Sequence, residues 1–186
     1  MARAALAAWV TAICVVLGGC ARIADVEAPA MMVPSRITQP ASAPAQTVEA
    51  VRHSVVKVSA PAVGCGTLTG GSGFVVAPQK VVTAAHVVAG SDSVSVDADG
   101  TVLAARVVSY DENADVAVLD VPGLTAAPLS LAGLPVSPHT EAVALGYPGG
   151  GDLSVVPAQI GALLDLTGPN LSHTARVTRA VYVVSM

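Results

Sequence analysis

The sequence contains few aromatic and few charged residues. Aromatic side chains make up 3% and charged ones 12% of the 186 residues, whereas 53% are hydrophobic. Because that hydrophobic content is mostly alanine and valine, it favours short β-branched strands over long amphipathic helices. The net charge of −4 provides no basic patch, so the composition argues against nucleic acid as a partner.

Long hydrophobic runs are also missing after the first 20 residues, where no stretch could span a bilayer without a polar break. The N-terminus itself combines Arg3 with an apolar run that closes on Leu17-Gly18-Gly19-Cys20. A short apolar run ending in small residues is typical of a secretory signal. Its last four residues resemble the bacterial lipobox, whose cysteine is acylated and becomes the first mature residue. An ordinary signal peptide with an incidental cysteine is the alternative.

The lipobox predicts a lipoprotein signal peptide over residues 1–19 and lipidation of Cys20. The protein would then be exported and held by its lipid on the extracytoplasmic face of the cell membrane. Scattered prolines among alanine and serine predict a flexible tether over residues 20–47, because proline resists helix and donates no backbone hydrogen bond. The remaining residues, 48–186, form the expected domain.

Cysteine is scarce, with 3 in the chain. Cys14 would leave with the signal peptide and Cys20 would carry lipid, so Cys65 has no partner within the sequence. Two interpretations stay open: a buried structural thiol, or a partner supplied by another chain or another part of the protein.

Short valine-rich segments recur from residue 54 onward, with turn signals between them. The expected strands are residues 54–58, 73–77, 80–83, 93–97, 101–109 and 115–120. Pro78-Gln79 and Asp99-Gly100 separate two pairs of these strands and predict hairpins. Asp97–Gly100 also looks like the start of a calcium loop, but the closing glutamate is absent, which favours the hairpin turn. Strands this short and regular predict a barrel or sandwich.

The sequence contains no phosphate-binding loop, no metal-ligand cluster and no repeat, so we expect no cofactor and no metal site. Of the four histidines, His53, His139 and His173 are expected to be structural. His86 differs, because it follows an apolar strand and two small residues that allow a tight turn. Asp115 then opens a later strand, with room for a hairpin between the two.

Two motifs identify a resemblance. Thr83-Ala84-Ala85-His86 together with Asn113-Ala114-Asp115-Val116-Ala117-Val118-Leu119 resembles the histidine and aspartate signature of the chymotrypsin-fold serine proteases, including the HtrA branch. Residues 71–78, 145–151 and 165–169 look more narrowly like the extracytoplasmic protease domain of the actinobacterial MarP proteases. The resemblance covers about residues 50–184. It implies an all-β, chymotrypsin-like double barrel with a complete first barrel and an incomplete second barrel.

The resemblance also implies a function, that of a trypsin-like serine endopeptidase acting on protein or peptide substrates. His86 would act as general base toward a serine hydroxyl, and Asp115 would orient the imidazole and stabilise its charged form.

The family's nucleophile lies in a G-x-S-G-G-P loop, and no such sequence occurs in the 186 residues. Ser72 lies between glycines, but the resemblance places it in a structural turn leading into the second strand. We therefore expect the chain alone to be inactive, as a truncated endopeptidase. Two alternatives remain: a non-catalytic envelope lipoprotein whose β domain binds a partner, and assembly with a separately encoded second half.

The lipobox interpretation predicts that Cys20→Ala releases the protein from membranes, because the thiol is the point of lipid attachment. Fractionation of expressing cells measures this. Membrane association that is unchanged in the variant would contradict the prediction.

Overall fold

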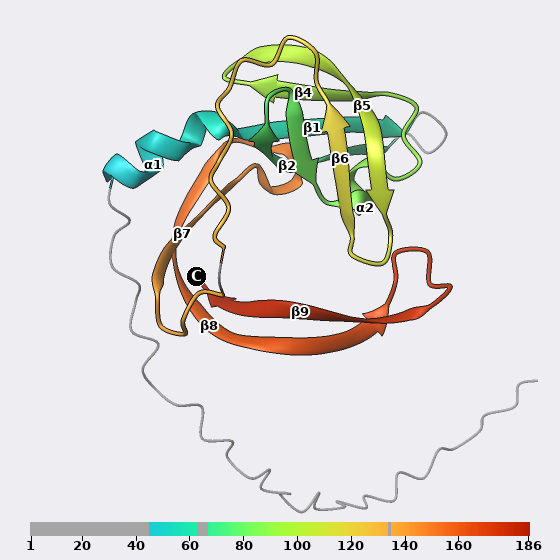
Figure 1. Cartoon of the computed structure of the whole chain (residues 1–186). Helices are drawn as coiled ribbons and strands as arrows, with labels where there is room; N and C mark the ends of the chain where they lie inside the picture. Colours follow the sequence, from blue (N-terminus) through green and yellow to red (C-terminus); the bar gives the residue numbers. More distant parts are fainter. Residues whose placement is uncertain (1–44, 63–66, 134) are drawn as a thin grey trace, which may run out of the picture. The chain divides into compact units, whose positions relative to one another are not determined.

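The computed structural model describes residues 45–62, 67–133 and 135–186 (Figure 1). The expected signal peptide, Cys20, Cys65 and most of the expected tether lie outside these residues. Helix α1 (Ala45–Val51) and the 3-10 turn η1 (Arg52–Ser54) come first, so the last three residues of the expected tether are helical. In the described part of the chain, no helix is long and apolar enough to cross a membrane.

Six antiparallel strands then close into a barrel in the order β1-β2-β3-β6-β5-β4 (Figure 1). They are β1 (Val55–Ala62), β2 (Thr67–Ala77), β3 (Lys80–Thr83), β4 (Val94–Ala98), β5 (Thr101–Asp111) and β6 (Val116–Asp120). Each expected strand has its counterpart. The closed ring leaves no unpaired edge within this first barrel.

Both predicted hairpin turns are confirmed. Gln79 takes a φ of 59° between β2 and β3, and Asp99 and Gly100 take 50° and 83° between β4 and β5. The two successive positive φ values at Asp99 and Gly100 produce a hairpin turn whose twist matches that of the flanking strands. The Asp97 side chain accepts a hydrogen bond from the backbone N–H of Gly100 (2.8 Å), so Asp97–Gly100 is a hairpin turn.

The barrel core consists of small side chains, chiefly valine and alanine, with Leu119 as its largest fully buried residue. Glycines on β2 make room for them. A Cβ at Gly73 would lie 2.7 Å from a Val81 methyl, and one at Gly71 would lie 2.8 Å from a Val87 methyl. A core without large aromatics is therefore closed by bringing backbone and valine side chains into direct contact.

Ser72 lies within strand β2, and the expectation that it belongs to a turn before the second strand is wrong. Gly71 and Gly73 face the core, so the alternation of a strand turns Ser72 away from it.

A second sheet follows, with the strand order β7-β8-β9. Its strands are β7 (Glu141–Gly146), β8 (Ser154–Pro169) and β9 (Arg176–Ser185), with the 3-10 turn η2 (Pro148–Gly150) after β7. Three antiparallel strands are half of a six-stranded barrel. The described residues thus confirm the expected architecture of a complete first barrel and an incomplete second one.

Ser72 joins the barrel to the second sheet. Its Oγ accepts a hydrogen bond from the backbone N–H of Tyr147 (2.7 Å), while its carbonyl accepts one from the Thr83 hydroxyl (2.8 Å). The sheet approaches closely here, because a Cβ at Gly146 would lie 2.5 Å from Ser72 Oγ. Small residues on both sides permit this contact.

We predict that Ser72→Ala lowers the free energy of unfolding by about 1 kcal/mol, because a partly buried N–H of Tyr147 loses its acceptor. Chemical denaturation measures the change. Ser130→Ala, which alters a serine in an exposed loop, is the matched control. Equal stability of the Ser72 variant and the control would show that the contact contributes nothing.

Candidate active site

His86 occupies the one-turn helix α2 (Ala85–Val88), which follows β3 directly. Ala85, Val87 and Val88 are buried in the barrel core, so His86 is the residue of this turn that faces outward. Its side chain is 57% exposed. The small residues before it allow the chain to leave β3 and turn at once.

Asp115 lies immediately before β6, at the end of a tight turn. The Asp111 carboxylate caps that turn by accepting hydrogen bonds from the backbone N–H groups of Asn113 (2.8 Å) and Ala114 (3.0 Å). Asp115 itself has a φ of 57°, in the left-handed region that aspartate tolerates better than most residues. This conformation directs its side chain toward α2.

The structure brings the two predicted residues together. His86 Nδ1 lies 2.8 Å from Asp115 Oδ2, and the backbone N–H of His86 donates to Asp115 Oδ1 (2.9 Å). The backbone N–H of Ala85 donates to the main-chain carbonyl of Asp115 (3.2 Å). Three contacts therefore fix both carboxylate oxygens and the backbone of Asp115 against α2.

Opposing effects act on the pKa of Asp115. Partial burial alone would raise it, but the hydrogen bonds from the His86 ring and backbone, the ring's charge and the more distant Arg179 together hold the pKa below 3.8. Asp115 is consequently ionised at neutral pH.

An ionised carboxylate can only accept hydrogen bonds, so its contact with Nδ1 requires that nitrogen to carry the proton. In the neutral ring Nε2 then has a free lone pair. A neutral imidazole held in this tautomer by a carboxylate, with the ring exposed, can accept a proton from a hydroxyl group.

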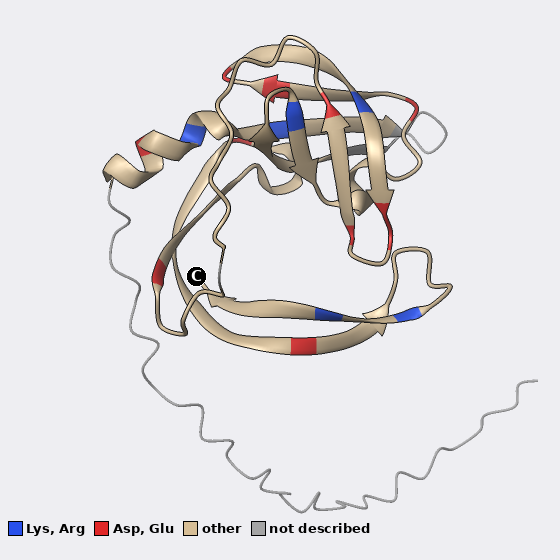
Figure 2. Ribbon diagram, in the orientation of Figure 1, with Lys and Arg blue, Asp and Glu red and all other residues tan. Residues whose placement is uncertain are grey.

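The remaining histidines lie elsewhere. His53 Nδ1 contacts Asp99 Oδ2 (2.6 Å), while His139 and His173 are exposed loop residues with positive φ. Among the described residues, no group of three histidine, cysteine or acidic side chains could hold a metal ion. Lysine, arginine, aspartate and glutamate are scattered over the ribbon without a concentration of either sign (Figure 2).

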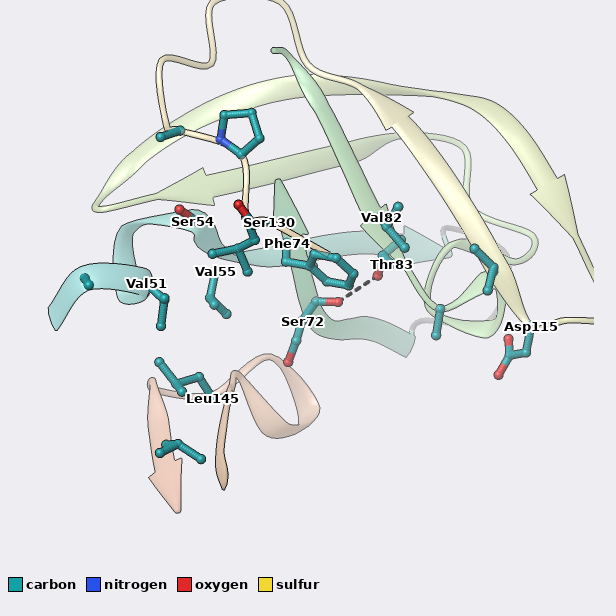
Figure 3. Close-up of a pocket in the computed structure, with 18 residues that line it drawn as sticks. Val51, Ser54, Val55, Ser72, Phe74, Val82, Thr83, Asp115, Ser130 and Leu145 are labelled. Atoms are coloured by element: carbon teal, nitrogen blue, oxygen red, sulfur yellow. Dashed lines mark hydrogen bonds between the residues drawn. The ribbon is translucent and has the colours of Figure 1, made fainter. Parts of the chain in front are cut away.

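A groove of about 900 Å³ lies between the barrel, α1 and β7. Figure 3 shows Val51 and Leu145 near one end, Ser72 and Phe74 in the middle, and Asp115 at the other end. Its lining is mainly apolar. Asp115 thus lies at the boundary between the first barrel and the second sheet, and His86, which is not among the lining residues, contacts it there.

A closed six-stranded barrel, a partial second sheet and a His–Asp pair at their boundary define the architecture of a chymotrypsin-like serine protease. Residues 71–183 match the family model described as a trypsin-like peptidase domain. The chain belongs to this family.

The relatives agree with the more specific resemblance. The serine proteases Rv3671c and MT3772 of two Mycobacterium tuberculosis strains are each 42% identical over 154 residues, covering 82% of this chain and 39% of their own. The chain thus spans about two fifths of the length of these curated relatives. This likeness confirms the resemblance to the MarP proteases that the motifs indicated.

Solved structures show the same relationship. The active form of the Rv3671c protease superposes with a TM-score of 0.74 at 42% identity, over 78% of this chain and 66% of that one. The HtrA-type protease AlgW with a tripeptide has a TM-score of 0.58 at 25% identity, over 68% of this chain and 41% of that one.

The lowered pKa of Asp115 predicts a pH dependence of stability. Because the folded pKa lies below 3.8, the ionised carboxylate stabilises the fold above that pH, and this contribution disappears as the pH falls through the folded pKa. The difference in unfolding free energy between wild type and Asp115→Asn should therefore shrink as the pH falls below about 4. Denaturation at a series of pH values measures it. A difference that is independent of pH would refute the prediction.

Proposed function

We propose that this domain supplies the general base and its orienting carboxylate to a trypsin-like serine endopeptidase. The observation that carries the proposal is the 2.8 Å contact between His86 Nδ1 and Asp115 Oδ2 beside an exposed imidazole ring. Family membership supports the reaction class, which is hydrolysis of peptide bonds in protein or peptide substrates.

In the proposed reaction, His86 Nε2 takes the proton of a serine hydroxyl as the oxygen attacks the scissile carbonyl. The same nitrogen then returns the proton to the leaving amine. Asp115 holds the ring in the required tautomer and stabilises the imidazolium while the proton resides there. Its fixed position matters, because neither of its oxygens can turn away without losing a hydrogen bond to His86.

The serine of this reaction is not supplied by residues 1–186, which contain no G-x-S-G-G-P sequence. We expect a polypeptide of these residues alone to be inactive. In subtilisin, removal of the serine costs about a million-fold in turnover, and the residual rate depends on the oxyanion hole that the nucleophile loop helps to form.

A non-catalytic role is the second candidate, in which an envelope lipoprotein binds a partner through its β domain. Such a role would use the large apolar residues exposed on the second sheet, since such surfaces often mark interaction sites. They are Val155, Leu163, Leu164, Leu166, Val183 and Val184. Under either candidate we propose an exported protein held at the membrane by lipid on Cys20, as the lipobox indicates.

A fusion distinguishes the candidates. Residues 1–186 are joined to the segment of Rv3671c that follows the matched region, and labelling by a fluorophosphonate probe, which reacts with activated serines, is compared with that of residues 1–186 alone. We expect labelling and peptide hydrolysis from the fusion and none from the unfused chain.

Within the fusion, Asp115→Asn should lower kcat about 10⁴-fold, because an asparagine amide favours the wrong imidazole tautomer. His86→Ala should lower it about 10⁶-fold. His139→Gln, which changes an exposed loop histidine, serves as the control. A folded fusion that is neither labelled nor active would favour the partner-binding candidate.

A further inference from the structure

Asn170 is a buried polar residue that the proposed reaction does not use. It lies at the start of the β8–β9 connection and is 3% exposed. Its Oδ1 accepts hydrogen bonds from the backbone N–H groups of Thr174 (2.9 Å) and Ala175 (3.1 Å), which fixes the orientation of its amide. The amide nitrogen must therefore point the other way.

That nitrogen points to the turn before Asp115. Asn170 Nδ2 lies 3.1 Å from Glu112 Oε1 and 3.3 Å from Asn113 Oδ1, with the Thr174 hydroxyl as a further acceptor at 3.1 Å. The backbone N–H of Leu171 donates to the Glu112 carbonyl (3.2 Å). Figure 1 shows the β5–β6 turn next to the β8–β9 connection.

Arg179 on β9 contacts the same turn. Its Nε donates to the main-chain carbonyl of Asn113, two residues before Asp115. Residues of the second sheet thus bind the Asp111–Ala114 turn of the first barrel at four atoms: the backbone carbonyls of Glu112 and Asn113 and their side-chain oxygens.

We propose that Asn170 and Arg179 are positioning residues, which hold the turn before Asp115 so that its carboxylate meets His86. This inference rests on the proposed function, because it assigns a role within that site. Its physical basis is the short distance along the chain between the turn and Asp115. Asp115 follows the turn directly and has a left-handed backbone conformation, so rotation of the turn would displace its carboxylate from α2.

Hydrogen exchange of the full chain tests the proposal without requiring activity. The amides of Ala85 and His86 report the dyad, because both donate to Asp115. The amides of Val121 and Leu129 are internal references, since they donate to Gln79 and Val75 in other parts of the first barrel. Failure of the fusion to hydrolyse peptides would leave these exchange rates unaffected, so the two proposals can fail separately.

Asn170→Asp is the main variant. The carboxylate keeps the acceptor for Thr174 and Ala175 but loses the donor to Glu112 and Asn113, and it repels the Glu112 carboxylate. We expect Ala85 and His86 to exchange at least about tenfold faster, with Val121 and Leu129 changed less than about twofold.

The double variant Glu112→Gln with Asn170→Asp reverses donor and acceptor while conserving net charge. The glutamine amide can now donate to the aspartate, so protection of Ala85 and His86 should return to within about threefold of wild type. Thr178→Ala is the control beside Arg179, because that hydroxyl pairs with Thr167 on the sheet itself.

A second measurement covers the case of a poorly folded variant. Asn170→Ala and Arg179→Lys change no charge, so an upward movement of the Asp115 pKa in a carboxyl ¹³C titration would report loosened hydrogen bonds from His86, which lower that pKa. Unchanged exchange in Asn170→Asp, equal acceleration of all four amides, or an unchanged Asp115 titration in both Asn170→Ala and Arg179→Lys would each overturn the proposal.

Discussion

The carboxylate of Asp115 is the contact on which the candidate site depends. It joins two segments that are distant in sequence, accepting hydrogen bonds from both the ring and the backbone of His86. Burial works against the charge, and the contacts from His86 together with the charge of Arg179 outweigh it, so the group stays ionised. Both its geometry and its charge serve the same purpose, which is to hold one imidazole tautomer with Nε2 available. The barrel and the second sheet position this one group.

The scarcity of aromatic residues determines how the core of the first barrel is packed. Valine, alanine and leucine form its core, and the glycines of β2 let those side chains approach the backbone closely. The same glycine-rich strand turns Ser72 toward the second sheet, where it accepts the Tyr147 N–H. Close packing and attachment of the second sheet therefore come from one segment, residues 70–73. A larger residue at Gly73 would collide with Val58 and Val81.

Local patterns predict most of the first barrel. Asp99-Gly100 specifies its hairpin through the positive φ values that aspartate and glycine tolerate, and Pro78 favours a turn through its fixed φ. The motifs around His86 and Asp115 point to the pair. The hydrogen bond between Ser72 and Tyr147 was not predictable, because the two residues are 75 positions apart in the sequence. Local sequence patterns assign no role to Asn170, although this residue contacts Glu112 and Asn113 across 58 and 57 residues. Long-range contacts of single polar residues leave no periodic pattern to detect.

The central claim is that Asp115 holds the His86 ring with its proton on Nδ1 and Nε2 free. Long-range ¹H–¹⁵N correlation of the His86 side chain, at a pH where the ring is neutral, measures this directly. The structure predicts a protonated Nδ1 and an unprotonated Nε2 in the wild-type chain. A proton found on Nε2, with Nδ1 bare beside the carboxylate, would contradict the claim.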